Sequence, residues 1–84
     1  MDKNWREPVR LTDDQVSTIN TLYRAHKFAS PRKKFDWKSP RTGEQFEFSY
    51  NTLEPWYKAM IKKKQVIREY VSLLNQIYTY FTSL

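Results

Sequence analysis

Aromatic and polar side chains alternate on both sides of the only glycine in the chain, and no other feature of the sequence constrains the fold as strongly. A period of two is typical of β-strands with one buried face. The aromatic members are Phe35, Trp37, Phe46, Phe48 and Tyr50. Between the two runs, Pro40 suits the second position of a tight turn, and Gly43 suits the left-handed position that closes it. The sequence therefore predicts a β-hairpin over residues 34–50.

One register of this hairpin is favoured by the aromatic residues. It places Trp37 opposite Phe46, and it gives all five aromatic side chains a common face. A shift by one residue would divide them between two faces. So short a chain has few other ways to bury apolar area, so we expect this face to pack in the core beneath helices. The alternative is a surface on which the bases of single-stranded nucleic acid stack.

Residues 12–29 have helical periodicity and a clear start signal. Thr12 and Gln15 have the spacing of a capping box, in which the two side chains satisfy backbone N–H groups at the helix start. The helix is expected to end near Ala29, because a Ser-Pro pair follows. Residues 1–10 show no period, so we expect an extended arm there.

A second helical pattern covers residues 53–83, with Pro55 in its first turn, where a missing N–H costs nothing. A continuous helix of about 30 residues spans about 45 Å, whereas a compact domain of this size is about 30 Å across. We expect the helix either to break near residues 62–65 or to pack along a second chain. The sequence thus predicts one small basic α+β domain over residues 1–84: an N-terminal helix, a β-hairpin with an aromatic face and a long C-terminal amphipathic helix.

Positive charge is concentrated in the middle of the chain. The whole chain carries +6 at pH 7, and residues 21–68 hold twelve basic residues against four acidic ones, a net +8. Basic side chains attract phosphates and release counterions, which gives affinity for nucleic acid without sequence readout. We therefore expect a non-enzymatic nucleic-acid-binding protein that contacts the phosphate backbone of duplex DNA. The predicted contacts are Arg24, Lys27, Arg32, Lys33, Lys34, Lys38, Arg41, Lys62, Lys63, Lys64 and Arg68.

The C-terminal helix predicts self-association. Residues 70–84 carry no charge, and the apolar stripe of the helix is wide. Monomeric proteins generally avoid exposing large apolar patches, so we expect a homodimer in which two helices cover each other. Such a dimer would also bring two basic patches onto one surface. The predicted dimer interface consists of Ile67, Tyr70, Leu74, Ile77 and Phe81.

The same residues are compatible with two other functions. A small inhibitor or adaptor, of the type common in viruses and mobile elements, would dock on an acidic surface of a larger protein. Basic side chains would steer that association, and aromatic side chains would anchor it. A structural subunit of an assembly, joined through the C-terminal helix, is the third interpretation.

Catalysis is not expected. The chain has one histidine, His26, and no cysteine, glycine-rich phosphate loop or metal-ligand spacing. Asp36 and Glu47 are expected to approach each other across the hairpin, but no base or electrophile accompanies them. We therefore expect no catalytic residue, cofactor or metal. The lack of a signal peptide and of an apolar run of about 18 residues predicts a cytoplasmic protein without membrane contact.

Overall fold

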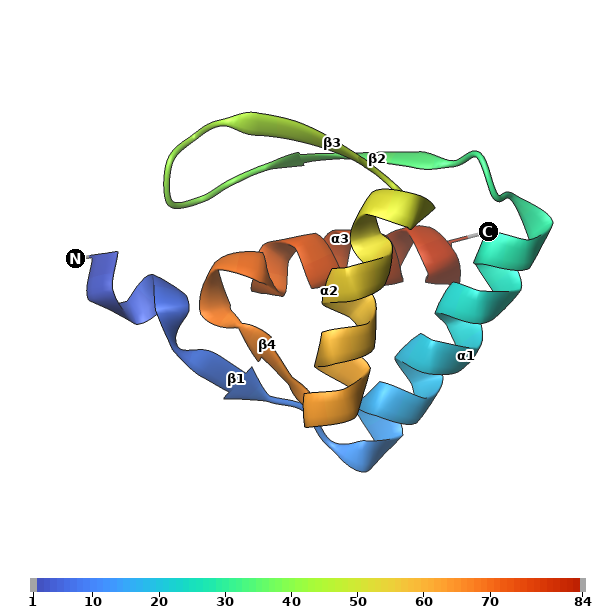
Figure 1. Cartoon of the computed structure of the whole chain (residues 1–84), viewed down its shortest axis with the longest axis horizontal. Coiled ribbons are helices and arrows are strands. Elements are labelled where there is room, and N and C mark those ends of the chain that lie inside the picture. Colours follow the sequence, from blue (N-terminus) through green and yellow to red (C-terminus); the bar gives the residue numbers. More distant parts are fainter. Residues whose placement is uncertain (1, 84) are drawn as a thin grey trace.

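The computed structural model describes residues 2–83, which form three α-helices, two short 3-10 helices and two antiparallel two-stranded sheets (Figure 1). In chain order the elements are η1 (Asp2–Arg6), β1 (Pro8–Arg10), α1 (Asp13–Ala29), β2 (Lys34–Lys38), β3 (Gln45–Ser49), α2 (Tyr50–Lys63), β4 (Gln65–Ile67), η2 (Arg68–Tyr70) and α3 (Val71–Thr82). The α+β class predicted from the sequence is confirmed. Residues 1 and 84 lie outside the described range.

The hairpin has the predicted register, with Trp37 opposite Phe46 and Phe35 opposite Phe48. Gly43 has a φ of 77°, the left-handed conformation that closes the turn. The two strands bury their rings unequally. Phe35 and Trp37 are each 3% exposed, whereas Phe46 is 38% exposed. The aromatic face of β2 is therefore core, and that of β3 borders solvent.

The segment predicted as one long helix over residues 53–83 is two helices. α2 begins earlier than predicted, because the Ser49 side chain accepts a hydrogen bond from the N–H of Thr52 and caps the helix. This cap also ends the hairpin one residue before its predicted limit. At Lys64 the backbone adopts the left-handed conformation (φ 54°, ψ 42°), and α2 stops there, inside the 62–65 window. β4 and η2 then turn the chain, and α3 runs back beneath the hairpin (Figure 1).

The extended arm predicted over residues 1–10 is only partly extended. Its first part forms the 3-10 helix η1, and its last part forms β1, which pairs with β4 so that Val9 lies opposite Val66. The N–H of Leu11 donates to the carbonyl oxygen of Lys64 at 2.8 Å and continues this pairing. Residues 65–67 are no longer helical, so their backbone N–H and C=O groups need hydrogen-bond partners from elsewhere in the chain. Strand β1 supplies these partners.

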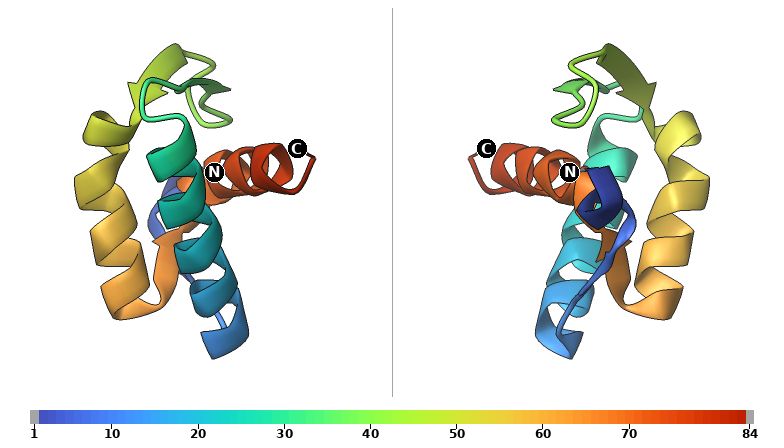
Figure 2. Two further views of the ribbon diagram at one scale, coloured as in Figure 1. Left: turned by 90° about the vertical axis from the view of Figure 1, so that its right-hand side faces the viewer. Right: turned by 90° about the vertical axis from the view of Figure 1, so that its left-hand side faces the viewer.

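Helix α3 completes the core of the domain. Figure 2 shows it crossing the direction of α1 and α2. The ring of Phe81 packs edge-on against Tyr23 of α1 and Phe35 of β2. The indole Nε1 of Trp37 donates to the hydroxyl of Ser72 at 2.9 Å. Helix α3 is therefore tied to both the first helix and the hairpin.

This position of α3 buries three of the five residues of the predicted dimer interface. Leu74, Ile77 and Phe81 are 7%, 2% and 4% exposed, and Ile67 and Tyr70 are half-buried. Leu74, Ile77 and Phe81 therefore have their partners within their own chain and are core residues. The homodimer stays a prediction, with Ile67 and Tyr70 as the members of the predicted interface that keep exposed surface.

Candidate binding groove between α1 and α2

Five of the eleven predicted nucleic-acid contacts are held in ion pairs with acidic side chains. The pairs are Lys27–Glu54 (2.8 Å), Lys34–Glu47 (3.8 Å), Arg41–Glu69 (3.1 Å), Lys64–Asp13 (2.7 Å) and Arg68–Glu7 (3.3 Å). Each acidic partner offsets the positive field of its cation. The net charge of the middle segment therefore overstates the field that a polyanion would meet.

The other six predicted contacts come from four segments. They are Arg24 on α1, Arg32 and Lys33 in the turn after it, Lys38 on β2, and Lys62 and Lys63 at the end of α2. Lys33 holds its ammonium group over the ring of Tyr80, 4.5 Å from the ring centroid. Among all eleven, Arg24, Lys27 and Lys62 line one groove, and Lys63 and Lys64 border a separate hollow near the start of α1.

The groove that these three residues share has a volume of about 710 Å³ and lies between α1 and α2. The two helices run in opposite directions along its walls (Figures 1 and 2). The lining consists of Asn20, Tyr23, Arg24, Lys27, Phe28 and Pro31 on one side and of Glu54, Tyr57, Lys58, Ile61 and Lys62 on the other. Residues three and four apart share a helix face, which is why these positions line the groove together.

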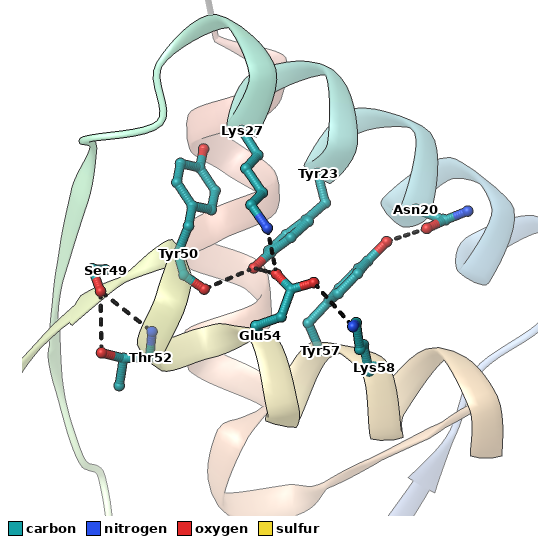
Figure 3. Close-up of polar contacts among 9 residues, drawn as sticks. All are labelled: Asn20, Tyr23, Lys27, Ser49, Tyr50, Thr52, Glu54, Tyr57 and Lys58. Atoms are coloured by element: carbon teal, nitrogen blue, oxygen red, sulfur yellow. Dashed lines mark hydrogen bonds and ion pairs between the residues drawn. The ribbon is translucent and has the colours of Figure 1, made fainter.

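Two stacked tyrosine rings form the floor of the groove. The ring centroids of Tyr23 and Tyr57 are 3.7 Å apart, and the ring planes differ by 7°. Both side chains are buried. The hydroxyl of Tyr57 donates to Oδ1 of Asn20 and so joins the two walls (Figure 3). Each helix contributes one ring, so the floor is a firmly packed, largely apolar surface.

Glu54 is the one acidic residue among the lining residues, and three side chains hold it (Figure 3). Lys27 Nζ lies 2.8 Å from Oε1 and Lys58 Nζ lies 3.7 Å from Oε2, while the Tyr23 hydroxyl donates to Oε1 at 3.4 Å. The hydrogen bond from Lys27 holds the pKa of the Glu54 carboxyl below its usual range. Burial, together with the nearby carboxylate, raises the pKa of the Tyr23 hydroxyl. At neutral pH Glu54 is therefore charged and Tyr23 is neutral.

Four cations surround that one carboxylate along the rim, which gives the lining a net charge of +3. They are Arg24 and Lys27 on α1 and Lys58 and Lys62 on α2. At the end of the α1 wall, Phe28 is 90% exposed, although it is a large apolar side chain. The groove can therefore take up apolar groups on its floor and negative charges along its rim.

Phe28 and Lys58 are not among the site residues predicted from the sequence. Phe28 lies off the buried face of α1 that Val16, Ile19 and Tyr23 form, and a phenylalanine on an otherwise polar face is a usable signal. Lys58 is four residues before Lys62, so the two share a helix face. Neither signal points to a groove until the position of the second wall is known.

The histidine and the carboxylate pair considered from the sequence lie on different elements of the described chain. His26 stacks on Phe81 at the edge of the core, with ring centroids 4.6 Å apart. Asp36 and Glu47 lie opposite each other on the hairpin and are both exposed. Within residues 2–83, no group of three or more histidine or acidic side chains is placed to hold a metal ion.

The chain was compared with protein families, curated proteins and solved structures. No family model matches the chain, and no curated protein and no solved structure matches it. In the part of the chain that the structure describes, no helix is both long and apolar enough to cross a membrane.

Proposed function

We propose that the protein is a non-enzymatic interaction module that binds an acidic, partly apolar segment of a larger protein in the groove between α1 and α2. The observation that carries the proposal is one concave surface with an apolar floor, a net +3 rim and the exposed ring of Phe28 at its end.

The two parts of the groove have separate roles in binding. The cations of the rim steer an acidic partner and raise the association rate. Phe28 supplies affinity, because its ring is 90% exposed in the free protein and burying one phenylalanine side chain contributes about 1.5–3 kcal/mol. Aromatic and arginine side chains are also enriched at protein interfaces relative to the rest of the surface. Phe28 is such an aromatic residue and Arg24 is such an arginine.

The apolar floor favours a protein partner over duplex DNA. A DNA backbone presents charged phosphates, which are bound by basic side chains and backbone N–H groups rather than by apolar rings. The exposed ring of Phe28 and the half-buried side chain of Ile61 would remain uncovered under such a backbone. Nucleic-acid binding, the function predicted from charge, stays a prediction.

Selection from a displayed library of random peptides, about 14 residues long, tests the proposal. We expect the enriched peptides to combine acidic with apolar residues, and to lose binding to a variant with Arg24→Glu and Lys62→Glu. The matched control is Arg6→Glu with Arg10→Glu, which changes the net charge equally on exposed residues away from the groove. This control should retain binding, and circular dichroism should show that both variants are folded.

Two outcomes would overturn the proposal. The first is that no peptide is enriched, or that enriched peptides bind both variants equally. The second is binding of random-sequence duplex DNA that falls linearly in log salt and is lost in the Arg24, Lys62 variant, since this would assign the groove to phosphate contacts.

A further inference from the structure

We infer that the segment bound in the α1–α2 groove is a single amphipathic α-helix with acidic residues on both flanks of its apolar stripe. This inference rests on the proposed function and names the shape of the partner. Residues 2–83 themselves form the surrounding elements and leave the groove open to solvent.

The walls of the groove favour a helix over an extended strand. Its lining comes from α1, the turn after it and α2, and neither sheet contributes an edge. Backbone N–H and C=O groups along these helices are already paired within them. An extended segment would press its own unpaired backbone groups against an apolar floor, which is unfavourable. A helix pairs those groups internally and presents only side chains.

The length of the groove matches a short helix. On α2 the lining runs from Glu54 to Lys62, and on α1 it runs from Asn20 to Phe28. Each stretch rises about 12 Å at 1.5 Å per residue, a little over two turns. A helix of about three turns would therefore cover the floor and reach the ring of Phe28.

The charges indicate where the acidic residues of that helix lie. Lys27 and Lys58 already pair with Glu54, so the rim cations left to meet an acidic partner are Arg24 on one wall and Lys62 on the other. One acidic residue on each flank of the helix would meet these two cations. Glu54 already pairs with Lys27 across the groove and would repel an acidic residue near it. The end of the helix beside Glu54 is therefore expected to lack acidic residues.

Substitution of Phe28 tests the inference separately from the charges of the rim. At 90% exposed, its ring makes little contact within the described chain, so replacing it should leave the fold largely intact. In the bound state the ring would contact the apolar stripe of the helix. Binding would then remove the ring from water, so its loss should weaken binding.

Two displayed libraries of equal length and equal composition test the shape of the partner. One places apolar residues at i, i+3, i+4 and i+7 with acidic residues on the flanks, and the other alternates apolar and acidic residues with a period of two. We expect binders from the first library alone. A purified binder should gain helical circular dichroism when the protein is added, and a proline at its centre should weaken binding by about tenfold or more.

A pair of protein variants locates the contact. Phe28→Ala should weaken binding of the purified peptide by about tenfold or more. Tyr78→Ala is the control, because Tyr78 is also exposed but lies on α3, away from the groove, and should leave binding unchanged. Binders from the alternating library, or a proline variant that binds as well as its parent, would overturn the inference that the bound segment is a helix. The proposal that the groove binds an acidic protein segment would not be affected. Failure of both libraries would overturn the proposed function with it.

Discussion

Replacing Tyr50 by phenylalanine tests the packing of the core where α1, α2 and the hairpin meet. The ring of Tyr50 lies edge-on to Tyr23 and to Phe35, with centroid separations of 5.3 and 5.6 Å. The residue is 1% exposed, and its hydroxyl has no hydrogen-bond partner among the described residues (Figure 3). The substitution removes that hydroxyl and keeps both ring contacts.

We expect Tyr50→Phe to stabilise the protein by about 1 kcal/mol. A buried polar group without a partner costs about 1–3 kcal/mol, and part of that gain is offset by the small space that the missing oxygen leaves. In a domain of this size, 1 kcal/mol raises the midpoint of thermal unfolding by about 4–8 °C. Thermal and urea unfolding followed by circular dichroism would both detect the change.

Tyr23→Phe is the matched control for this prediction. The hydroxyl of Tyr23 donates to the carbonyl oxygen of Tyr50 and to Glu54, at 3.4 Å in each case. Removing it should therefore destabilise the protein by about 0.5–1.5 kcal/mol. If Tyr50→Phe destabilises the protein as much as Tyr23→Phe does, the hydroxyl of Tyr50 makes a favourable interaction and the reasoning is refuted.

Three further substitutions or conditions have expected outcomes. Burial, with a smaller effect of Tyr80, raises the pKa of Tyr50 to about 12, so the folded protein binds this proton more tightly than the unfolded chain. The free energy of unfolding measured in urea should accordingly fall as the pH rises from 10 to 12. This fall should be about 2 kcal/mol smaller in Tyr50→Phe than in the wild type, because the variant lacks the titrating hydroxyl. Gly43→Val should lower the free energy of unfolding by about 1–3 kcal/mol, because valine is strained in the left-handed conformation. Gly43→Asn should leave it near the wild-type value, because asparagine tolerates that conformation and a Cβ at this position meets no atom within 4 Å. Trp37→Ala should cost about 3–5 kcal/mol in urea unfolding, and a nearly neutral result would place the ring outside the core.

The start of α1 and the hairpin register were predictable because their determinants lie close together in the sequence. Gln15 N–H donates to the hydroxyl of Thr12 at 3.1 Å, and Thr12 N–H donates to Gln15 Oε1 at 2.8 Å, as the capping box requires. In the hairpin, a period of two leaves one register in which Trp37 and its aromatic neighbours share a face. In both cases a few consecutive residues carry the whole signal.

The end of α2 lacks such a local signal. Lys64 adopts a left-handed conformation that costs a residue other than glycine about 1–2 kcal/mol, and its sequence neighbours do not require it. The conformation is held by Leu11, whose N–H bonds to the Lys64 carbonyl oxygen, and by Asp13, 51 residues away, whose carboxylate accepts a hydrogen bond from the Lys64 side chain. The length of the helical pattern therefore indicated a break, but not the strand pairing that stabilises it.

Charge counted along the chain likewise omits the pairing that folding creates. Arg68 is 61 residues from Glu7, and Arg41 is far from Glu69 in the sequence, yet both cations are paired in the folded protein. A window such as residues 21–68 counts these cations without their partners, because Glu7 and Glu69 fall outside it. Net charge predicted attraction to an acidic partner, but it did not predict which cations remain available to it.

The break in the helix at Lys64 changes which apolar side chains are left exposed to solvent. A continuous helix over residues 53–83 would have left its apolar stripe without cover, and that uncovered stripe was the reason to expect a second chain. Because the chain turns at Lys64, Leu74 and Ile77 lie in the core of their own domain and do not need a second chain to cover them. The turn also leaves α2 as a short wall antiparallel to α1 (Figure 1). Among the large apolar side chains that the structure describes, Phe28 is then the most exposed, at 90%, so the expected contact with a partner moves from the C-terminal helix to the rim of the groove.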